Sequence, residues 1–153
     1  MTRDNAGRMA NDHSSSVLSD EDRAIARRLI DGIDEFNLKA TGITEFHEML
    51  TVERDPVGEL IGGVYGWSWG GTCWIEALWV REDMRRHGVG SRLLAAAETE
   101  ARRHGCAQLA LDTHTFQARS FYERHGFEVV SELKDYPRGH SRLVLSKRLP
   151  DTV

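Results

Sequence analysis

A short glycine-containing segment carries the clearest chemical signal in this chain: Arg85-Arg86-His87-Gly88-Val89-Gly90. It lies between an apolar run with strand character and a run with helical spacing. Glycines can adopt positive φ angles, and without a Cβ they let ligand oxygens approach the main chain closely. The first N–H groups of the helix that follows have no partner within the helix, and the helix dipole is positive at that end. Because two arginines accompany the glycines, the segment predicts a binding site for a diphosphate, and therefore a nucleotide-bearing cofactor.

Two familiar phosphate-binding motifs are excluded at this segment. A P-loop requires lysine followed by serine or threonine after its last glycine, whereas Ser91-Arg92 follows Gly90. No third glycine completes a dinucleotide-binding fingerprint. Two glycines before a helix also occur in ordinary tight turns, so the neighbouring residues must decide between the two interpretations.

A second pattern further along the chain favours a cofactor site. The segment R-x-x-G-x-G follows the apolar residues Leu78-Trp79-Val80, and a later stretch places Ala118, Tyr122 and Gly126-Phe127 at the spacing A-x-x-x-Y-x-x-x-G-F. The two patterns, which cover roughly residues 76–130, together resemble the signatures of the GNAT superfamily of acyl-CoA-dependent N-acyltransferases. Thr115 stands where that family commonly has asparagine, so a side-chain amide is missing there.

The resemblance implies an α+β fold. In this GNAT-type three-layer sandwich, a mixed, mostly antiparallel central sheet is splayed between its fourth and fifth strands and carries helices on both faces. Residue spacing alone predicts the same order of elements. The expected elements are a helix over 19–41, antiparallel strands near 47–54, 60–69 and 72–81, a crossover helix over 89–104, a strand near 107–112, a short helix over 117–125, and two final strands near 127–133 and 141–149.

We expect residues 1–18 to be a disordered leader, because they are polar and rich in small residues. Residues 19–153 are expected to form a single N-acetyltransferase domain. The first β-strand of the family is not recognisable before residue 47.

The composition of the 153 residues excludes several classes of protein. Lys and Arg number 20 against 24 Asp and Glu, a formal net charge of -4, so no basic excess favours nucleic-acid binding. Cys73 and Cys106 are too few for a disulfide framework and are expected in the core. The seven histidines lack paired ligand spacing, so no metal site is expected. No run approaches the ~20 apolar residues of a membrane span and no signal-peptide core is visible, so a cytoplasmic location is expected.

The resemblance implies acetyl-CoA as the co-substrate. Main-chain groups of the strand before the glycine segment would receive the pantetheine amides and the thioester oxygen, while the segment itself would hold the pyrophosphate. The cofactor-binding residues implied in this way are Leu78, Trp79, Val80, Arg85, Arg86, His87, Gly88, Val89, Gly90, Ser91, Thr115, Ala118 and Tyr122.

Two residues are candidates for proton transfer. By resemblance, Tyr122 lies beside the coenzyme sulfur and donates a proton to the departing thiolate, although a core aromatic is the alternative. Glu76 lies two residues before Leu78 and is therefore expected on the same strand face, near the acceptor end of the cleft. A carboxylate in an apolar run could act as a general base, directly or through water, or could form a cross-strand ion pair with an arginine.

Three further residues are candidates for binding the acceptor: Trp67, Trp74 and His114. An open indole face favours a flat or cationic acceptor, whereas the alternative is that the tryptophans are core residues and His114 caps a loop. The expected reaction moves an acetyl group to a primary amine of a small molecule, an amino acid or a peptide, by direct attack in a ternary complex. Two alternatives stay open, namely a noncatalytic acyl-CoA-binding or regulatory module and a protein-interaction domain. A homodimer also stays open, since this fold often pairs through its last strands.

Overall fold

The computed structural model describes residues 17–150, and the chain divides after Thr44 into two compact units. In the first unit, the predicted helix is α1 (Asp20–Thr41). The Ser19 hydroxyl accepts a hydrogen bond from the Asp22 N–H, and the Asp22 carboxylate accepts one from the Ser19 N–H, each at 3.1 Å, which completes a capping box. Within residues 17–150, no helix is both long and apolar enough to cross a membrane.

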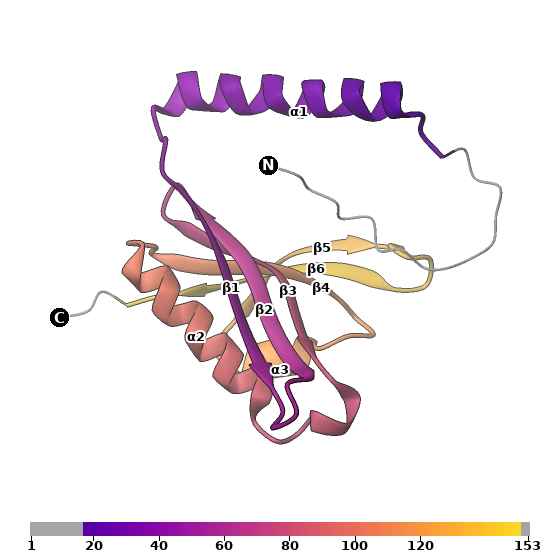
Figure 1. Cartoon of the computed structure of the whole chain (residues 1–153), viewed down its shortest axis with the longest axis vertical. Coiled ribbons are helices and arrows are strands. Elements are labelled where there is room, and N and C mark those ends of the chain that lie inside the picture. The colour runs from indigo at the N-terminus through magenta and orange to yellow at the C-terminus, as the bar shows by residue number, and fades with distance from the viewer. Residues whose placement is uncertain (1–16, 151–153) are drawn as a thin grey trace. The chain divides into compact units, whose positions relative to one another are not determined.

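The second unit is built on one sheet with the strand order β1-β2-β3-β4-β6-β5 (Figure 1). All neighbouring strands are antiparallel except β3 and β4, which are parallel. The mixed, mostly antiparallel sheet and the α+β class are thus as predicted. The elements of this unit are β1 (Phe46–Arg54), β2 (Leu60–Trp69), β3 (Thr72–Val80), the 3-10 turn η1 (Glu82–Met84), α2 (Val89–Arg103), β4 (Gln108–His114), α3 (Arg119–Arg124), β5 (Glu128–Lys134) and β6 (Ser141–Arg148).

Helix α2 crosses one face of the sheet and contacts β1, β2, β3 and β4 (Figure 1). Its predicted apolar stripe is confirmed, because every member is 1% exposed: Val89, Leu93, Ala97 and Ala101. On the sheet side, Val64, Ile75, Leu109, Leu111, Leu143 and Leu145 complete this core. We call this side of the sheet the core face.

Both cysteines are buried, as predicted. Burial raises the pKa of the Cys73 thiol to about 12 and also raises the pKa of the Cys106 thiol. A thiol is nucleophilic only as the thiolate, so both cysteines act as small apolar core residues.

The sheet splits between β3 and β4. These strands pair only from Thr72↔Gln108 to Ile75↔Leu111, whereas β3 continues to pair with β2 as far as Val80. Within residues 17–150, the edge of β3 that faces β4 therefore has no ladder partner after Ile75. The split lies between the third and fourth strands rather than the predicted fourth and fifth, because the stretch before β1 is helical and adds no strand.

A β-bulge lies where the split begins. Tyr65 pairs with Ala77 while its neighbour Gly66 pairs with Ile75, so Glu76 is an extra residue on β3. The bulge corrects one prediction, that Glu76 shares a face with Leu78. The register pairs Leu78 with Val64 on the core face, because the extra residue interrupts the alternation of side chains.

Gly66 is required by the bulge. A Cβ at this position would overlap the carbonyl oxygen of Trp74 and would lie 3.0 Å from Met49 Cε and 3.2 Å from Ile75 Cα. The main chain of β3 can bend toward β2 only because residue 66 has no side chain.

Gly66→Ala is expected to lower the free energy of unfolding by about 3 kcal/mol. The added Cβ forces the Trp74 carbonyl to move, and this movement disturbs the hydrogen bonds between β2 and β3. Thermal unfolding should show a Tm at least about 10 °C below that of the wild type. Gly32→Ala is the matched control: no atom lies within 4 Å of its added Cβ, and alanine favours the helix. A Gly66→Ala protein with a Tm within 2 °C or so of the wild type would contradict the account of the bulge.

Candidate active site

A cavity of about 780 Å³ opens where β3 and β4 diverge, a size suited to an organic ligand. Three segments form its wall: the end of β3, the loop before α2 with the first turn of that helix, and the segment from the end of β4 through α3. Its lining residues are Leu78, Trp79, Val80, Arg85, Arg86, Gly88, Gly90, Ser91, Phe116, Gln117, Ala118, Phe121, Arg124 and His125. Three of these side chains are guanidinium groups, and none of the lining residues within 17–150 is acidic, so the cavity favours an anion.

The glycine loop has the backbone geometry of an anion site. Arg86 adopts φ 64° and Gly88 adopts φ 77°, so left-handed residues alternate along the loop. Such alternation turns successive N–H groups toward one point. Gly88 is also the N-cap of α2 and has no side chain to satisfy the first N–H groups of the helix. These N–H groups are therefore suited to bind a ligand.

Gly90 brings α2 close to α3. A Cβ at this position would lie 3.3 Å from Cζ of Phe121 and 3.7 Å from Cγ2 of Val80. Both of these residues line the cavity. A larger side chain at position 90 would therefore push against α3 or enter the cavity.

Arg92 holds the glycine loop in place. Its Nε and Nη2 donate to the two carboxylate oxygens of Glu53 on β1 at 2.9 and 2.7 Å, and its Nη1 donates to the carbonyl of His87 at 3.2 Å. The hydrogen bond from Arg92 holds the pKa of Glu53 below its ordinary value. Since its guanidinium bonds both to Glu53 on β1 and to the His87 carbonyl of the loop, Arg92 is a structural anchor of the loop.

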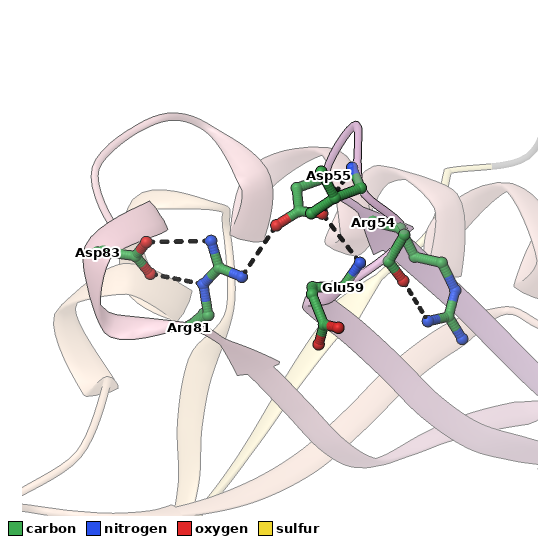
Figure 2. A network of polar contacts seen from close by, with 7 residues as sticks. Arg54, Asp55, Glu59, Arg81 and Asp83 are labelled. Atoms are coloured by element: carbon green, nitrogen blue, oxygen red, sulfur yellow. Dashed lines mark hydrogen bonds and ion pairs between the residues drawn. The ribbon is translucent and has the colours of Figure 1, made fainter.

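A second polar network anchors the segment between β3 and the glycine loop. Figure 2 shows Arg81 between Asp83 and Asp55, with Nε and Nη2 donating to the Asp83 carboxylate at 2.7 and 3.0 Å and Nη1 donating to Asp55 at 3.2 Å. Asp55 also accepts hydrogen bonds from the N–H groups of Val57 and Glu59, which fixes the β1–β2 turn. The turn and the approach to the glycine loop are thus tied together.

This network is expected to make stability depend on pH in acid. The hydrogen bond from the Glu59 N–H lowers the pKa of Asp55, with a smaller contribution from Arg81. A lowered folded-state pKa contributes stability above the ordinary value of 3.8, and this stability is lost as pH falls through the folded value. Asp55→Asn should lower Tm by a few degrees at pH 7, and the difference should shrink toward pH 2.5 or so. Asp31→Asn, at an exposed position of α1, is the control. If the Tm difference between Asp55→Asn and the wild type did not change with pH, the role given to the Asp55 carboxylate would be contradicted.

The structure places the predicted cofactor residues in two groups. Nine of them line the cavity: Leu78, Trp79, Val80, Arg85, Arg86, Gly88, Gly90, Ser91 and Ala118. The other four lie outside its lining. Val89, the first residue of α2, is buried in the core, and His87 bonds to the Arg85 carbonyl through Nδ1. Thr115 Oγ1 accepts a hydrogen bond from the Ser141 N–H, so it joins the end of β4 to β6.

Tyr122, the fourth of these residues, is 7% exposed on α3. Its ring lies edge-on to Phe121 and Phe127, at centroid distances of 5.2 and 5.7 Å. Burial, with a smaller effect of the Asp112 charge, raises the pKa of Tyr122 to about 12. Asp112 is the first residue of β4 that no longer pairs with β3, so it marks the start of the split. Because the Asp112 charge acts on Tyr122, the Tyr122 hydroxyl lies within electrostatic reach of that point. At neutral pH, Tyr122 is therefore a protonated, potential proton donor.

The candidate base and acceptor residues share the other face of the sheet, which we call the open face. Register pairs Trp67 with Trp74, and these rings stack at 6.5 Å. The register also pairs His114 with Arg142. Because side chains alternate along a strand and Leu143 lies on the core face, its neighbour Arg142 lies on the open face. The charge of Glu76 acts on Arg142, which binds Asp112 at 2.6 Å.

Two acidic side chains of the sheet act on the same tyrosine of the open face. The Tyr65 hydroxyl donates to Glu48 at 2.8 Å, and this bond, burial, and the charges of Glu48 and Glu76 raise the pKa of Tyr65. Glu76 thus lies within electrostatic reach of both Tyr65 and Arg142. Among residues 17–150, no three His, Cys, Asp or Glu side chains are grouped to hold a metal ion.

Five cavity residues are absent from the sequence-based prediction: Phe116, Gln117, Phe121, Arg124 and His125. Their positions depend on how α3 packs beside the first turn of α2, a contact between distant segments. One signal was available, because Phe121, Arg124 and His125 fall inside the A-x-x-x-Y-x-x-x-G-F pattern.

The model of the "Acetyltransferase (GNAT) family" matches residues 17–127. The chain belongs to the GNAT acetyltransferase family. This GNAT protein is 35% identical over 133 residues to acetyltransferase Atu2258 of Agrobacterium fabrum, with 86% of the chain and 97% of that relative covered. It is 41% identical over 96 residues to blasticidin-S acetyltransferase of Streptomyces morookaense, covering 60% of the chain and 68% of that relative.

Among solved structures, an acetyltransferase from Bacillus cereus matches this GNAT chain with a TM-score of 0.74 at 29% identity, over 90% of the chain and 98% of the other. The predicted family and fold are therefore confirmed. The homologues identify the chain as an acyltransferase.

Proposed function

We propose that this acetyltransferase moves an acetyl group from acetyl-CoA to a primary amine of a small molecule, an amino acid or a peptide, by direct attack in a ternary complex. One observation carries the proposal above all others. The cavity lined by three arginines and by the N-terminal turn of α2 continues along the unpaired edge of β3.

The residues present fit the coenzyme in two parts. The N–H groups around Gly88–Ser91, with Arg85, Arg86 and Arg124, suit the pyrophosphate. The main chain of Leu78–Val80 offers hydrogen bonds to the pantetheine amides, which would otherwise leave buried polar groups unsatisfied. When bound, acetyl-CoA supplies the acetyl thioester.

Three protein groups then serve the transfer in this proposal. An N–H of Trp79 or Val80 on the unpaired edge donates to the negative charge that develops on the thioester oxygen. Glu76 takes a proton from the acceptor ammonium, directly or through water, which leaves the neutral amine that attacks the thioester. Tyr122 donates a proton to the departing thiolate.

The charge of the open face suggests a cationic acceptor. The carboxylates of Glu48 and Glu76 near Tyr65 attract an ammonium group, and the stacked Trp67–Trp74 pair offers an indole face to it. The relative blasticidin-S acetyltransferase acts, by its name, on blasticidin S, so blasticidin S is the first acceptor to test.

The test is release of coenzyme A thiol from acetyl-CoA with a panel of acceptors: blasticidin S, polyamines, amino acids and short peptides. We expect turnover at least 100-fold above the rate without acceptor for one or more cationic amines, and much less for neutral alcohols. Coenzyme A binding without turnover on any amine would instead indicate a noncatalytic acyl-CoA module. The absence of any thermal shift with coenzyme A would favour a protein-interaction domain.

A further inference from the structure

His125 joins α3 to the first turn of α2 at the wall of the cavity. Its Nδ1 lies 2.8 Å from the carbonyl oxygen of Phe121, and its Nε2 lies 2.9 Å from Oγ of Ser91. Both His125 and Ser91 line the cavity. The two residues are 34 positions apart in the chain, so this contact exists only in the folded protein.

The contact fixes which ring nitrogen carries a proton. A carbonyl oxygen can only accept, so Nδ1 of His125 donates to Phe121. In the neutral ring, Nε2 then accepts a hydrogen bond from the Ser91 hydroxyl. In the protonated ring, Nε2 donates to Ser91 Oγ, and the serine proton is free to turn toward a ligand.

The charges around His125 make this choice sensitive to an anion. Arg85 and Arg86 line the same cavity from the glycine loop, and Arg124 lines it from α3. Three ion pairs lie on the surrounding elements: Arg119 with Glu123 on α3, Arg92 with Glu53 on the α2 side, and Lys147, near Gly126, with Glu98. An anion held among the three cavity arginines favours the protonated ring of His125.

We propose that His125 is a positioning residue that takes up a proton when the coenzyme binds and thereby turns the Ser91 hydroxyl toward the pyrophosphate. This inference rests on the proposed function, since it requires coenzyme A in this cavity. One proton moves from solvent to Nε2 of His125, which then donates a hydrogen bond to Ser91 Oγ. The Ser91 hydroxyl keeps its proton and donates its hydrogen bond to a phosphate oxygen instead of to Nε2. A charge-assisted hydrogen bond then forms on each side of Ser91.

The test is calorimetric titration of coenzyme A in two buffers of equal pH and different ionisation enthalpy. At pH 7, wild-type protein should take up several tenths of a proton more per coenzyme than His125→Gln does. The affinity of His125→Gln for coenzyme A should be about tenfold below wild type at pH 6 or so and within about twofold near pH 8.5. Because both proteins bind the same ligand, titration of the coenzyme's own phosphates cancels in the difference.

Three further measurements complete the design. His104→Gln, at the opposite end of α2, is the matched histidine control and should take up as many protons as the wild type. Ser91→Ala should weaken coenzyme binding, and His125→Gln should then add a smaller loss than in the wild type. If His125→Gln does not fold, NMR of the His125 ring in wild-type protein should show a larger protonated fraction with coenzyme A than without it.

The outcomes separate this inference from the proposed function. If wild-type protein binds no coenzyme A, the proposed function fails, and the inference with it. If it binds coenzyme A while the affinity ratio of wild type to His125→Gln is constant over the pH range and proton uptake is equal, only the role of His125 is overturned.

Discussion

Gly90→Val is expected to lower the affinity for coenzyme A by at least about 100-fold, or nearly 3 kcal/mol. The Cβ would already lie 3.3 Å from the Phe121 ring, so the added methyl groups must displace α3 or fill the cavity beside Val80. Either change obstructs the approach of a pyrophosphate to the first turn of α2. The measurement is the Kd of coenzyme A by calorimetry.

The matched control for this variant is Gly32→Val. No atom lies within 4 Å of a Cβ at position 32, and this glycine belongs to α1, outside the unit that holds the cavity. We expect its Kd to stay within about twofold of the wild type. A folded Gly90→Val protein whose Kd also stays within that range would remove the glycine loop from the binding site.

Tyr122→Phe is expected to lower kcat by about 100-fold with little change in the Kd of coenzyme A. Phenylalanine keeps the edge-on contacts with Phe121 and Phe127 and removes only the hydroxyl. Because the pKa of Tyr122 is about 12, the wild-type hydroxyl keeps its proton from neutral pH to about pH 10. Tyr122 should therefore cause no loss of activity on the alkaline side within this range.

Steady-state kinetics and thermal unfolding of the same variant distinguish the roles of Tyr122. If Tyr122 only fills the core, Tyr122→Phe should affect Tm alone and leave kcat within about threefold of the wild type. That result would assign the proton for the thiolate to another donor, such as water.

Local patterns in the sequence were sufficient to predict most of the second unit. Apolar spacing located α2 and its buried stripe, and Gly70-Gly71 located the β2–β3 hairpin, because these features depend on neighbouring residues. The bulge at Glu76 could not be predicted in this way. It depends on the register between two strands, and its one local sign is a glycine at position 66 that must accommodate the Trp74 carbonyl.

In the candidate site, too, the features that depend on neighbouring residues were predictable, and those that depend on contacts between distant segments were not. The segment 85–91 and the end of β3 could be placed at one cavity from the glycines, the arginines and the family resemblance. Arg124 and His125 could not, because their place in the wall follows from the packing of α3 beside α2. Trp67, Trp74 and His114 were predicted from the sequence as acceptor-binding candidates, and that role stays a prediction. The face that they occupy could not be assigned before the strands β2, β3, β4 and β6 were aligned.

A crystal structure of the protein with coenzyme A tests the central claim most directly. In this complex, we expect the pyrophosphate to contact the N–H groups of Gly88–Ser91. We expect the pantetheine arm to lie along Leu78–Val80, in the gap between β3 and β4. Coenzyme A bound at another surface, or a gap closed by paired strands in the complex, would contradict it.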